Sequence, residues 1–396
     1  MMITSRLRHL AGTVRDELQL PHAARAARER DRRGLPAHDP GITQTVDAGL
    51  AWLAFAQDRS ISRDGGVARH FSIIDGWSAS YPETTGYIVP TVLEAARTRQ
   101  DAALRQRAIR MLDWLTHIQF PDGGFQGGPI GVPNPVPVVF NTGQILLGLA
   151  AGAHDVSDLY LDPMRRAANW LVRVQDPDGA WRRFTTPFAS PGEKTYATHV
   201  AWGLLEAHRV DPASGYADAA LANIDWALRQ QRANGWFERC CLTDHAQPLT
   251  HTIGYAVRGI LEGFRHSRDS RLLDAARRAA DGVLSAMSPR GFLPGRLNAN
   301  WRGCVSWACL TGSVQMAHCW LLLFLETGDA RYRDAAYAAN AYVRRSIVTN
   351  GADPNIRGGV KGSFPVDGGY GTFQYLNWAC KFSIDANLLE ASVRGG

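Results

Sequence analysis

One short motif returns at a nearly constant interval along the chain. Its marker is a glycine in a turn that follows a helical segment, and the five copies lie at Gly65, Gly123, Gly179, Gly235 and Gly291. Successive markers are 58, 56, 56 and 56 residues apart. A fixed period of this length is typical of repeat folds, in which each unit is one supersecondary element that packs on its neighbours.

A second repeated element, a polar cluster rich in Thr and Gly, lies between the markers and opens an apolar helical segment. First helices are expected near 45–58, 101–119, 163–176, 214–231, 270–287 and 331–347, and second helices near 83–97, 140–153, 196–208, 250–266, 309–326 and 376–390. The second helices are apolar nearly all round, as in helices buried within a second layer. We therefore predict an all-α fold, an (α/α)6 toroid over residues 45–396, with a basic, partly helical arm over residues 1–44.

The units Gln-x-x-Asp-Gly-Gly-Phe and Gln-x-x-Asp-Gly-x-Trp resemble the QW repeats of the squalene–hopene cyclase and prenyltransferase superfamily. This resemblance spans residues 45–390 and implies an α/α toroid in which Gln119, Gln175 and Gln231 tie neighbouring helices together. The segments 81–87 and 361–382 are also similar to uncharacterised toroid proteins encoded among bacterial exopolysaccharide and capsule genes. The superfamily's acidic motifs are missing, because no two aspartates are adjacent. The resemblance thus informs the fold more than the reaction.

The composition of the chain argues against several classes of function. Half of the net charge of +6 lies in residues 1–44, and no basic stripe is interleaved with aromatic residues, so we expect no nucleic-acid partner. No apolar run reaches 18 residues and no signal peptide is evident, which together with six scattered cysteines predicts a cytoplasmic protein. The spacing of Cys304, Cys309 and His318 does not fit a zinc site, and we expect no metal or cofactor.

The arm remains a candidate contact region. Leu7, Leu10, Val14 and Leu18 recur at helical spacing, which predicts a short amphipathic helix. Such a helix could touch a membrane surface or a protein partner, or pack on the toroid. The charged run 25–33 is typical of a solvated face.

The starts of the second helices should gather at one mouth of the ring, where long loops would form the walls of a cleft. Acidic residues are few there, and Glu83 is the best candidate for a catalytic acid, although an acid after Pro82 also favours a helix N-terminus. A glycosidase would need a second carboxyl group. A uronate lyase or epimerase would instead need a proton-removing His or Tyr and donors that neutralise a carboxylate.

The helix starts and adjacent loops supply such groups. The catalytic candidates are Glu83, His199, His251 and Tyr255, and the substrate-binding candidates are Tyr87, Asn141, Gln144, Arg302, Gln315, Asn377, Lys381, Trp77 and Trp307. Helix capping would also explain Asn141 and Asn377 among these candidates, together with Thr142, Thr198, Thr252 and Thr311 at the other helix starts. Packing between repeats would equally explain the histidines and tyrosines.

These features lead to one main hypothesis, a carbohydrate-active enzyme of lyase, epimerase or glycosidase type that acts on a bacterial polysaccharide or its precursor. The first alternative is a terpene cyclase-like or prenyltransferase-like enzyme acting on an isoprenoid. The second is a non-catalytic toroid that binds a glycan during polysaccharide biosynthesis.

Overall fold

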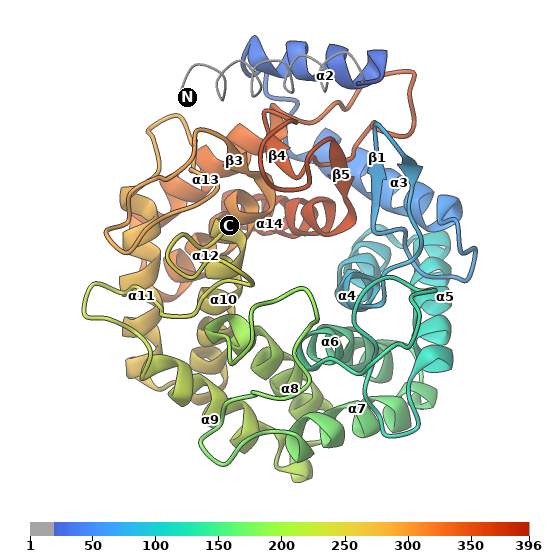
Figure 1. Cartoon of the computed structure of the whole chain (residues 1–396), viewed down its shortest axis with the longest axis vertical. Coiled ribbons are helices and arrows are strands. Elements are labelled where there is room, and N and C mark those ends of the chain that lie inside the picture. Colours follow the sequence, from blue (N-terminus) through green and yellow to red (C-terminus); the bar gives the residue numbers. More distant parts are fainter. Residues whose placement is uncertain (1–19, 396) are drawn as a thin grey trace, which may run out of the picture.

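The computed structural model describes residues 20–395, in which twelve helices form a closed ring of two layers (Figure 1). The outer layer comprises α3 (Ile42–Arg59), α5 (Ala102–Ile118), α7 (Leu161–Arg173), α9 (Tyr216–Leu228), α11 (Ser270–Ser285) and α13 (Ala330–Arg344). The inner layer comprises α4 (Pro82–Arg99), α6 (Val139–Asp155), α8 (Thr198–Val210), α10 (Thr250–Ser267), α12 (Leu310–Thr327) and α14 (Asn377–Gly395). The predicted (α/α)6 toroid is confirmed, with each helix within a few residues of its expected range.

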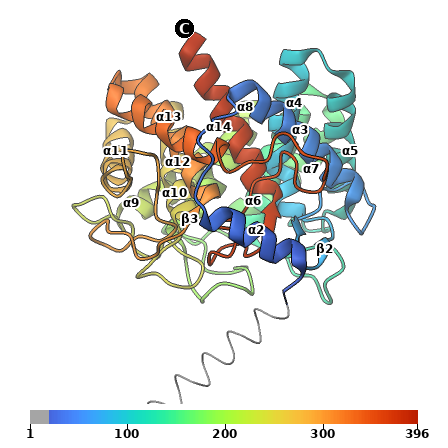
Figure 2. The same cartoon turned by 90° about the horizontal axis from the view of Figure 1, so that it is seen from above.

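Short strands and 3-10 helices occupy the connections between helices. The strands are β1 (His70–Ser72), β2 (Gly76–Trp77), β3 (Ala308–Cys309), β4 (Ser363–Phe364) and β5 (Gln374–Leu376), and the 3-10 helices are η1 (Asp158–Tyr160), η2 (Thr195–Ala197) and η3 (Pro212–Ser214). β1 pairs antiparallel with both β2 and β5, so that Phe71 lies opposite Trp77 and Tyr375. This pairing joins the loop of the first unit to that of the last. Figure 2 shows the long loops at one end of the ring and the C-terminal end of α14 at the other.

The repeated glutamines hold the units together as the resemblance implies. The Gln119 Nε2 amide donates one hydrogen bond to the carbonyl of Gly123 in its own turn, at 2.9 Å, and one to Pro163 at the start of α7, at 3.0 Å. Gln175 and Gln231 repeat both bonds one and two units later. Each glutamine therefore satisfies a turn carbonyl and a carbonyl of the next outer helix with one amide.

The marker glycines are required by conformation and by space. Gly235 has φ +88°, and a Cβ atom placed there would lie 2.4 Å from the backbone carbonyl of Arg278. Gly358, which the sequence period did not reveal, has φ +86° and would place a Cβ 2.0 Å from the carbonyl of Ala48 in α3. The sixth turn thus packs on the first outer helix, and the ring closes on itself.

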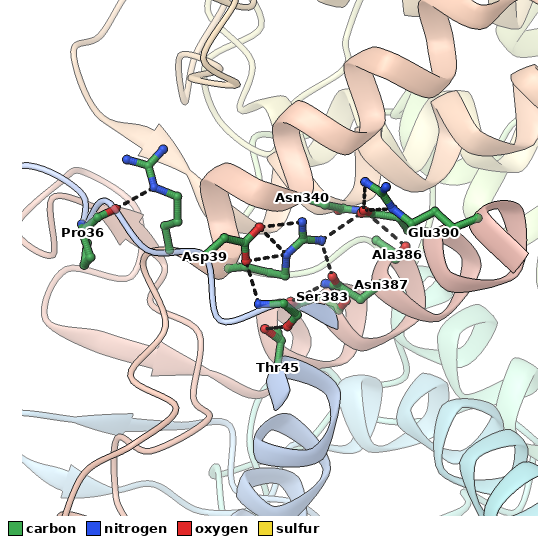
Figure 3. Close-up of polar contacts among 12 residues, drawn as sticks. Pro36, Asp39, Thr45, Asn340, Ser383, Ala386, Asn387 and Glu390 are labelled. Carbon is green, nitrogen blue, oxygen red and sulfur yellow. Dashed lines mark hydrogen bonds and ion pairs between the residues drawn. The ribbon is translucent and has the colours of Figure 1, made fainter. Parts of the chain in front are cut away.

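A buried ionic cluster reinforces this closure (Figure 3). The Arg344 guanidinium, at the end of α13, forms hydrogen bonds of 2.8–3.0 Å with both carboxylate oxygens of Asp39 in the segment before α3. It also donates to Asn387, at 2.8 Å, and to Glu390, at 2.9 Å, in α14. One arginine thereby joins the N-terminal segment to the last two helices.

The N-terminal region is docked on the ring as far as the structure describes it. Helix α2 (His22–Arg32) buries Ala24 and Ala27 against Val366 and Phe373. Asp31 is buried in an ion pair of 2.6 Å with Lys361, so the charged run 25–33 is not a wholly solvated face. The predicted helix of Leu7 to Leu18 lies outside the described residues. In residues 20–395, no helix is both long and apolar enough to span a membrane.

Candidate functional site

A cavity of about 490 Å³ opens at the loop end of the ring, where the inner helices begin. Its lining residues are Arg69, His70, Ser78, Ala79, Tyr81, Glu83, Thr84, Tyr87, Pro129, Phe140, Asn141, Thr186, Phe188, Tyr196, Leu242, His251, Thr252, Tyr255, Tyr370 and Trp378. Inner helices supply the floor, and five of the six long loops supply the walls. The volume lies in the range of small-molecule sites.

Glu83 is the one carboxylic acid among these lining residues. It lies in the first turn of α4, next to the Tyr81 hydroxyl. Burial raises the pKa of Glu83 to about 7, although the hydrogen bond from Tyr81 and the charge of Arg69 both act to lower it. Near neutral pH the carboxyl group is therefore close to half protonated, the condition in which one group can both give and accept a proton.

Tyrosines and a histidine from distant parts of the chain surround this acid. Tyr87 and Tyr255 are buried neighbours, and burial raises the pKa of both phenols well above the ordinary value. The His251 ring lies 5.3 Å from the Tyr255 ring and 4.9 Å from the Tyr370 ring. Burial, with the charge of Arg296, lowers the pKa of His251 to about 3. At neutral pH these phenols and the imidazole are uncharged hydrogen-bonding groups.

The aromatic wall is held by its own contacts. The Trp378 indole donates a 2.8 Å hydrogen bond to the Tyr370 hydroxyl, which fixes the loop residue Tyr370 over the start of α14. Phe140 packs edge-on against Tyr196 and Tyr255. Flat apolar faces with hydroxyls at their edges suit a ring-shaped ligand that carries both C–H faces and polar groups.

The structure brings five of the sequence candidates to the cavity, namely Glu83, Tyr87, Asn141, His251 and Tyr255. The Asn141 side chain lies next to the Tyr81 hydroxyl, and its buried amide nitrogen forms no hydrogen bond of regular geometry. Buried groups of this kind are rare in native structures, and one that faces a cavity marks a place where a ligand could accept a hydrogen bond. The roles of these five side chains remain predictions.

Five other candidates are buried in the inner layer without lining the cavity. His199 Nδ1 lies 2.6 Å from Gln144 Oε1, and the two side chains pair with each other behind Tyr255. Asn377 donates to the Ala68 carbonyl and to Thr84 Oγ1, which ties α14 to the first unit. The remaining two are Gln315, which packs against Gly254, and Lys381, which forms an ion pair of 2.6 Å with Asp385.

Three candidates lie outside the cavity wall. Trp77 donates from its indole to Asn355 and packs on Trp52, so it covers the outer layer instead of a ligand site. The ring of Trp307 packs against the glycines of the loop 365–371. Arg302 is exposed on a loop of the fifth unit, which contributes no residue to the cavity lining.

The expectation that the threonines cap the inner helices is wrong. The cap positions are held by residues such as Tyr81 and Val138, and no side chain caps an inner helix from α4 to α12. Instead, Thr142 lies inside the first turn, donates to the Val138 carbonyl, and accepts the N–H of Phe125 from the marker turn. Thr85 makes the equivalent bonds to Tyr81 and Val67. Thr85 and Thr142 therefore join a turn to a helix, whereas Thr198 donates to the carbonyl of Ala256 in α10 and the Thr311 hydroxyl makes no hydrogen bond.

Sequence reasoning missed much of the cavity, and the missed residues come mostly from loops. They include Arg69, His70, Tyr81, Tyr196, Tyr370 and Trp378. Tyr196 has a signal in the repeat, because it stands two residues before Thr198, as Glu83 and Phe140 stand two residues before Thr85 and Thr142. Arg69 and Tyr370 lie outside the repeated element and have no such signal.

A second hollow, of about 810 Å³, lies at the opposite end of the ring, between the C-terminal ends of α4, α6 and α8. Its charged side chains are largely paired with each other, as in Glu94 with Arg97 and Glu206 with Arg209. Groups already matched in this way have little left to offer a ligand. Within residues 20–395, no cluster of three or more His, Cys, Asp or Glu side chains is placed to hold a metal ion.

Comparisons with known proteins agree on the fold. Residues 43–261 match the model of the squalene-hopene cyclase C-terminal domain. A search of curated proteins gave no significant match. Among solved structures, an unsaturated glucuronyl hydrolase specific for heparin is similar with a TM-score of 0.72 and 15% identity, over 91% of this chain and 99% of that one.

Two further structures are similar over most of their length. A D-mannose isomerase has a TM-score of 0.68 and 12% identity, over 90% of this chain and 99% of that one. Cellobiose 2-epimerase from Bacillus thermoamylovorans has a TM-score of 0.66 and 12% identity, over 86% of this chain and 96% of that one. At these identities the likeness is one of fold.

Proposed function

The chain belongs to the family of the squalene-hopene cyclase C-terminal domain, and on this toroid we propose a carbohydrate-active enzyme of lyase, epimerase or hydrolase type in which Glu83 transfers the proton. The observation that carries the proposal is that Glu83 is the single carboxyl group among the described lining residues, where burial raises its pKa to about 7 and uncharged tyrosines lie around it. The similar solved structures are a glucuronyl hydrolase, a mannose isomerase and a cellobiose epimerase, which supports a sugar as substrate.

The presence of one carboxyl group among the described lining residues limits which types of reaction the cavity can catalyse. Glycosidases of the two-carboxylate type need a second carboxyl about 5–9.5 Å from the first. No described lining residue other than Glu83 offers one. We therefore favour elimination or epimerisation over two-carboxylate glycoside hydrolysis, because one group near its pKa can move a proton to or from a sugar carbon.

The remaining groups would bind and orient the sugar. Tyr87 and Tyr255 keep their protons and can donate hydrogen bonds to a sugar hydroxyl or to charge that develops on oxygen. Neutral His251 can accept or donate, and Trp378 and Phe140 offer apolar faces for the sugar ring. The substrate would be a segment of a bacterial polysaccharide or a precursor of one.

The test is turnover of a saccharide panel, acidic and neutral, by the wild type and by Glu83→Gln. Reactions run in deuterated water and followed by NMR and mass spectrometry separate the three types, because epimerisation places deuterium on carbon and elimination leaves an unsaturated product. We expect Glu83→Gln to lower kcat by about 10²- to 10⁴-fold. Glu94→Gln, at the exposed far end of the same helix, is the matched control and should keep full activity. Full turnover by Glu83→Gln would refute the role of the acid.

The aromatic lining favours a second candidate, an isoprenoid cyclase-like enzyme. Aromatic faces can stabilise a carbocation as well as hold a sugar. Against this candidate, protonation of a carbon–carbon double bond needs a strong acid, and a carboxyl group with a pKa of about 7 is weaker than an ordinary one. Turnover of a polyprenyl substrate would favour this candidate, and saccharide binding without turnover would favour a glycan-binding toroid.

A further inference from the structure

Arg69 is a cavity residue whose backbone is fixed from two sides. Its N–H donates to the carbonyl of Ala79, at 3.0 Å, and its carbonyl accepts from the N–H of Asn377 at the start of α14, at 3.2 Å. The residue therefore lies between the loop of the first unit and the helix of the last. Its guanidinium lines the cavity, half-buried, close to Glu83.

The surroundings of this guanidinium are aromatic. It lies 5.1 Å from the centre of the Trp378 ring and 5.7 Å from that of Tyr81. Its Nη1 lies 3.1 Å from Nδ1 of His70, whose pKa burial and the charge of Arg69 lower to about 4, so His70 is an uncharged acceptor. Within the described part of the chain, no carboxylate forms an ion pair with Arg69. By contrast, the buried Arg344 forms ion pairs with two carboxylates.

A cation that is partly removed from water and lacks a counter-ion is costly. Cation–π contacts offset part of that cost, and a bound anion would offset more. Arginine presents two parallel N–H groups that match the two oxygens of a planar carboxylate.

We propose that Arg69 binds the carboxylate of a hexuronic acid residue, so that the substrate is an acidic saccharide. This inference rests on the proposed function and names its substrate class. The sugar ring would then lie along Trp378 and the tyrosines, with Glu83 within the same cavity.

A single charge distinguishes the carboxylate from a phosphate ester. With His70 and His251 uncharged, Arg69 supplies one positive charge, which one carboxylate balances. A phosphate ester carries about −1.5 to −2 at neutral pH and would leave negative charge beside Glu83. A sulfate ester carries the same single charge and can also accept both N–H groups, so the sulfated analogue is a separate arm of the experiment.

Binding at Arg69 would also act on Glu83. The guanidinium lowers the pKa of Glu83, and an anion paired with it would cancel that effect. The acid would then hold its proton more firmly in the complex than in the free enzyme. An acidic substrate thereby prepares its own proton donor.

The experiment is calorimetric titration with two disaccharides that differ only in a terminal glucuronic acid or glucose, with a phosphorylated and a sulfated analogue as further arms. The wild type should prefer the glucuronate. Arg69→Gln should weaken glucuronate binding by about 10- to 100-fold and change glucose binding less than two-fold. Arg69→Lys keeps the positive charge but lacks the two parallel N–H groups, so its affinity for the glucuronate should lie between those of the wild type and Arg69→Gln. Arg302→Gln, an exposed arginine outside the cavity, is the control and should match the wild type.

The outcomes separate the two proposals. Equal affinity of the wild type for both disaccharides, or an equal loss for both in Arg69→Gln, overturns the carboxylate site while the carbohydrate function stands. Preference for the phosphorylated or sulfated analogue also overturns it. Failure of the wild type to bind or turn over any saccharide overturns the proposed function itself. Circular dichroism of each variant checks that it is folded.

Discussion

The outer turns and the inner mouth of the ring are built from the same repeat, yet they differ in what they preserve. In the turns, Gln119, Gln175 and Gln231 make the same pair of hydrogen bonds in three successive units. At the mouth, equivalent positions hold Glu83 and Phe140, two side chains with no chemistry in common. Hydrogen bonds in the turns link successive units, whereas the side chains at the mouth differ from unit to unit and line the candidate site. Changes in the turns should therefore cost stability, and changes in the mouth should cost activity.

The largest loss of stability is expected where the ring closes. Arg344→Ala would leave Glu390 buried without this partner and should lower the free energy of unfolding by about 3–5 kcal/mol. Arg394→Ala removes the more exposed partner of the same carboxylate and should cost about 0–1 kcal/mol. Urea unfolding of both variants checks the difference. Equal costs would mean that the cluster of Figure 3 does not hold the ring together.

A marker glycine should show the next largest effect. Gly235→Ala forces an L-residue into the left-handed region, at about 1–2 kcal/mol, and also drives its Cβ into the carbonyl of Arg278. Gly215→Ala has the same kind of positive φ, at +73°, but no atom within 4 Å, so it measures the conformational cost alone. The melting temperature should fall further for Gly235→Ala. Identical melting temperatures would show that close packing of the turn is unimportant.

At the mouth, replacing Glu83 should instead make the folded chain more stable relative to the wild type as the pH rises. Because the pKa of Glu83 is about 7 in the folded chain and 4.5 ordinarily, the unfolded chain releases its proton first as the pH rises. The protonated Glu83 therefore leaves the folded chain at its full stability below pH 4.5, and this contribution to stability is lost as the pH rises from 4.5 to 7. Glu83→Gln lacks this loss, so its stability relative to the wild type should rise by about 1–3 kcal/mol from pH 4.5 to 8. If the difference in stability between Glu83→Gln and the wild type stays constant from pH 4.5 to 8, the raised pKa of Glu83 is contradicted.

The smallest effect is expected for one glutamine tie. Gln231→Met removes the two hydrogen bonds of the repeat and a third that Gln231 Oε1 accepts from Arg278 at 2.8 Å, keeps the volume of the side chain, and should cost about 1–2 kcal/mol. Saccharide turnover at low temperature should be unchanged. If this variant lost turnover without losing stability, the claim that the turns determine stability and the mouth determines activity would be wrong.

The helices could be predicted from the sequence because the repeat marks both of their ends. Each marker glycine lies in the turn five to seven residues after the end of an outer helix, and the near-uniform apolar character of the inner helices places them in a second layer. The regular spacing does not predict the sixth turn, because its glycine, Gly358, lies 67 residues after Gly291 and the period is broken there. The closure of the ring was therefore expected from burial, and the structure shows it in the contact of Gly358 with Ala48, in the pairing of β1 with β5 and in the Arg344 cluster.

The cavity could be predicted only in part. Glu83, Tyr87 and Tyr255 lie in the inner helices, and the repeat placed them at the mouth. Arg69 and Tyr370 lie in long loops, where no period fixes which side chain turns inward. The three candidates that lie outside the cavity wall, Trp77, Trp307 and Arg302, are in the long connections between helices, where the same limit applies. Threonines at helix starts look alike whether they cap a helix or bind a turn, and only the positions of their partners distinguish the two.

The protonation state of Glu83 tests the central claim without knowledge of the substrate. Its carboxyl carbon can be followed by ¹³C NMR titration of protein labelled at glutamate, with the signal assigned by its absence in Glu83→Gln. We predict a midpoint near pH 7, which rises when glucuronate-containing disaccharide is added. A midpoint near 4.5, unmoved by the saccharide, would mean that Glu83 is an ordinary surface-like carboxylate and that the cavity lacks the proton donor assigned to it.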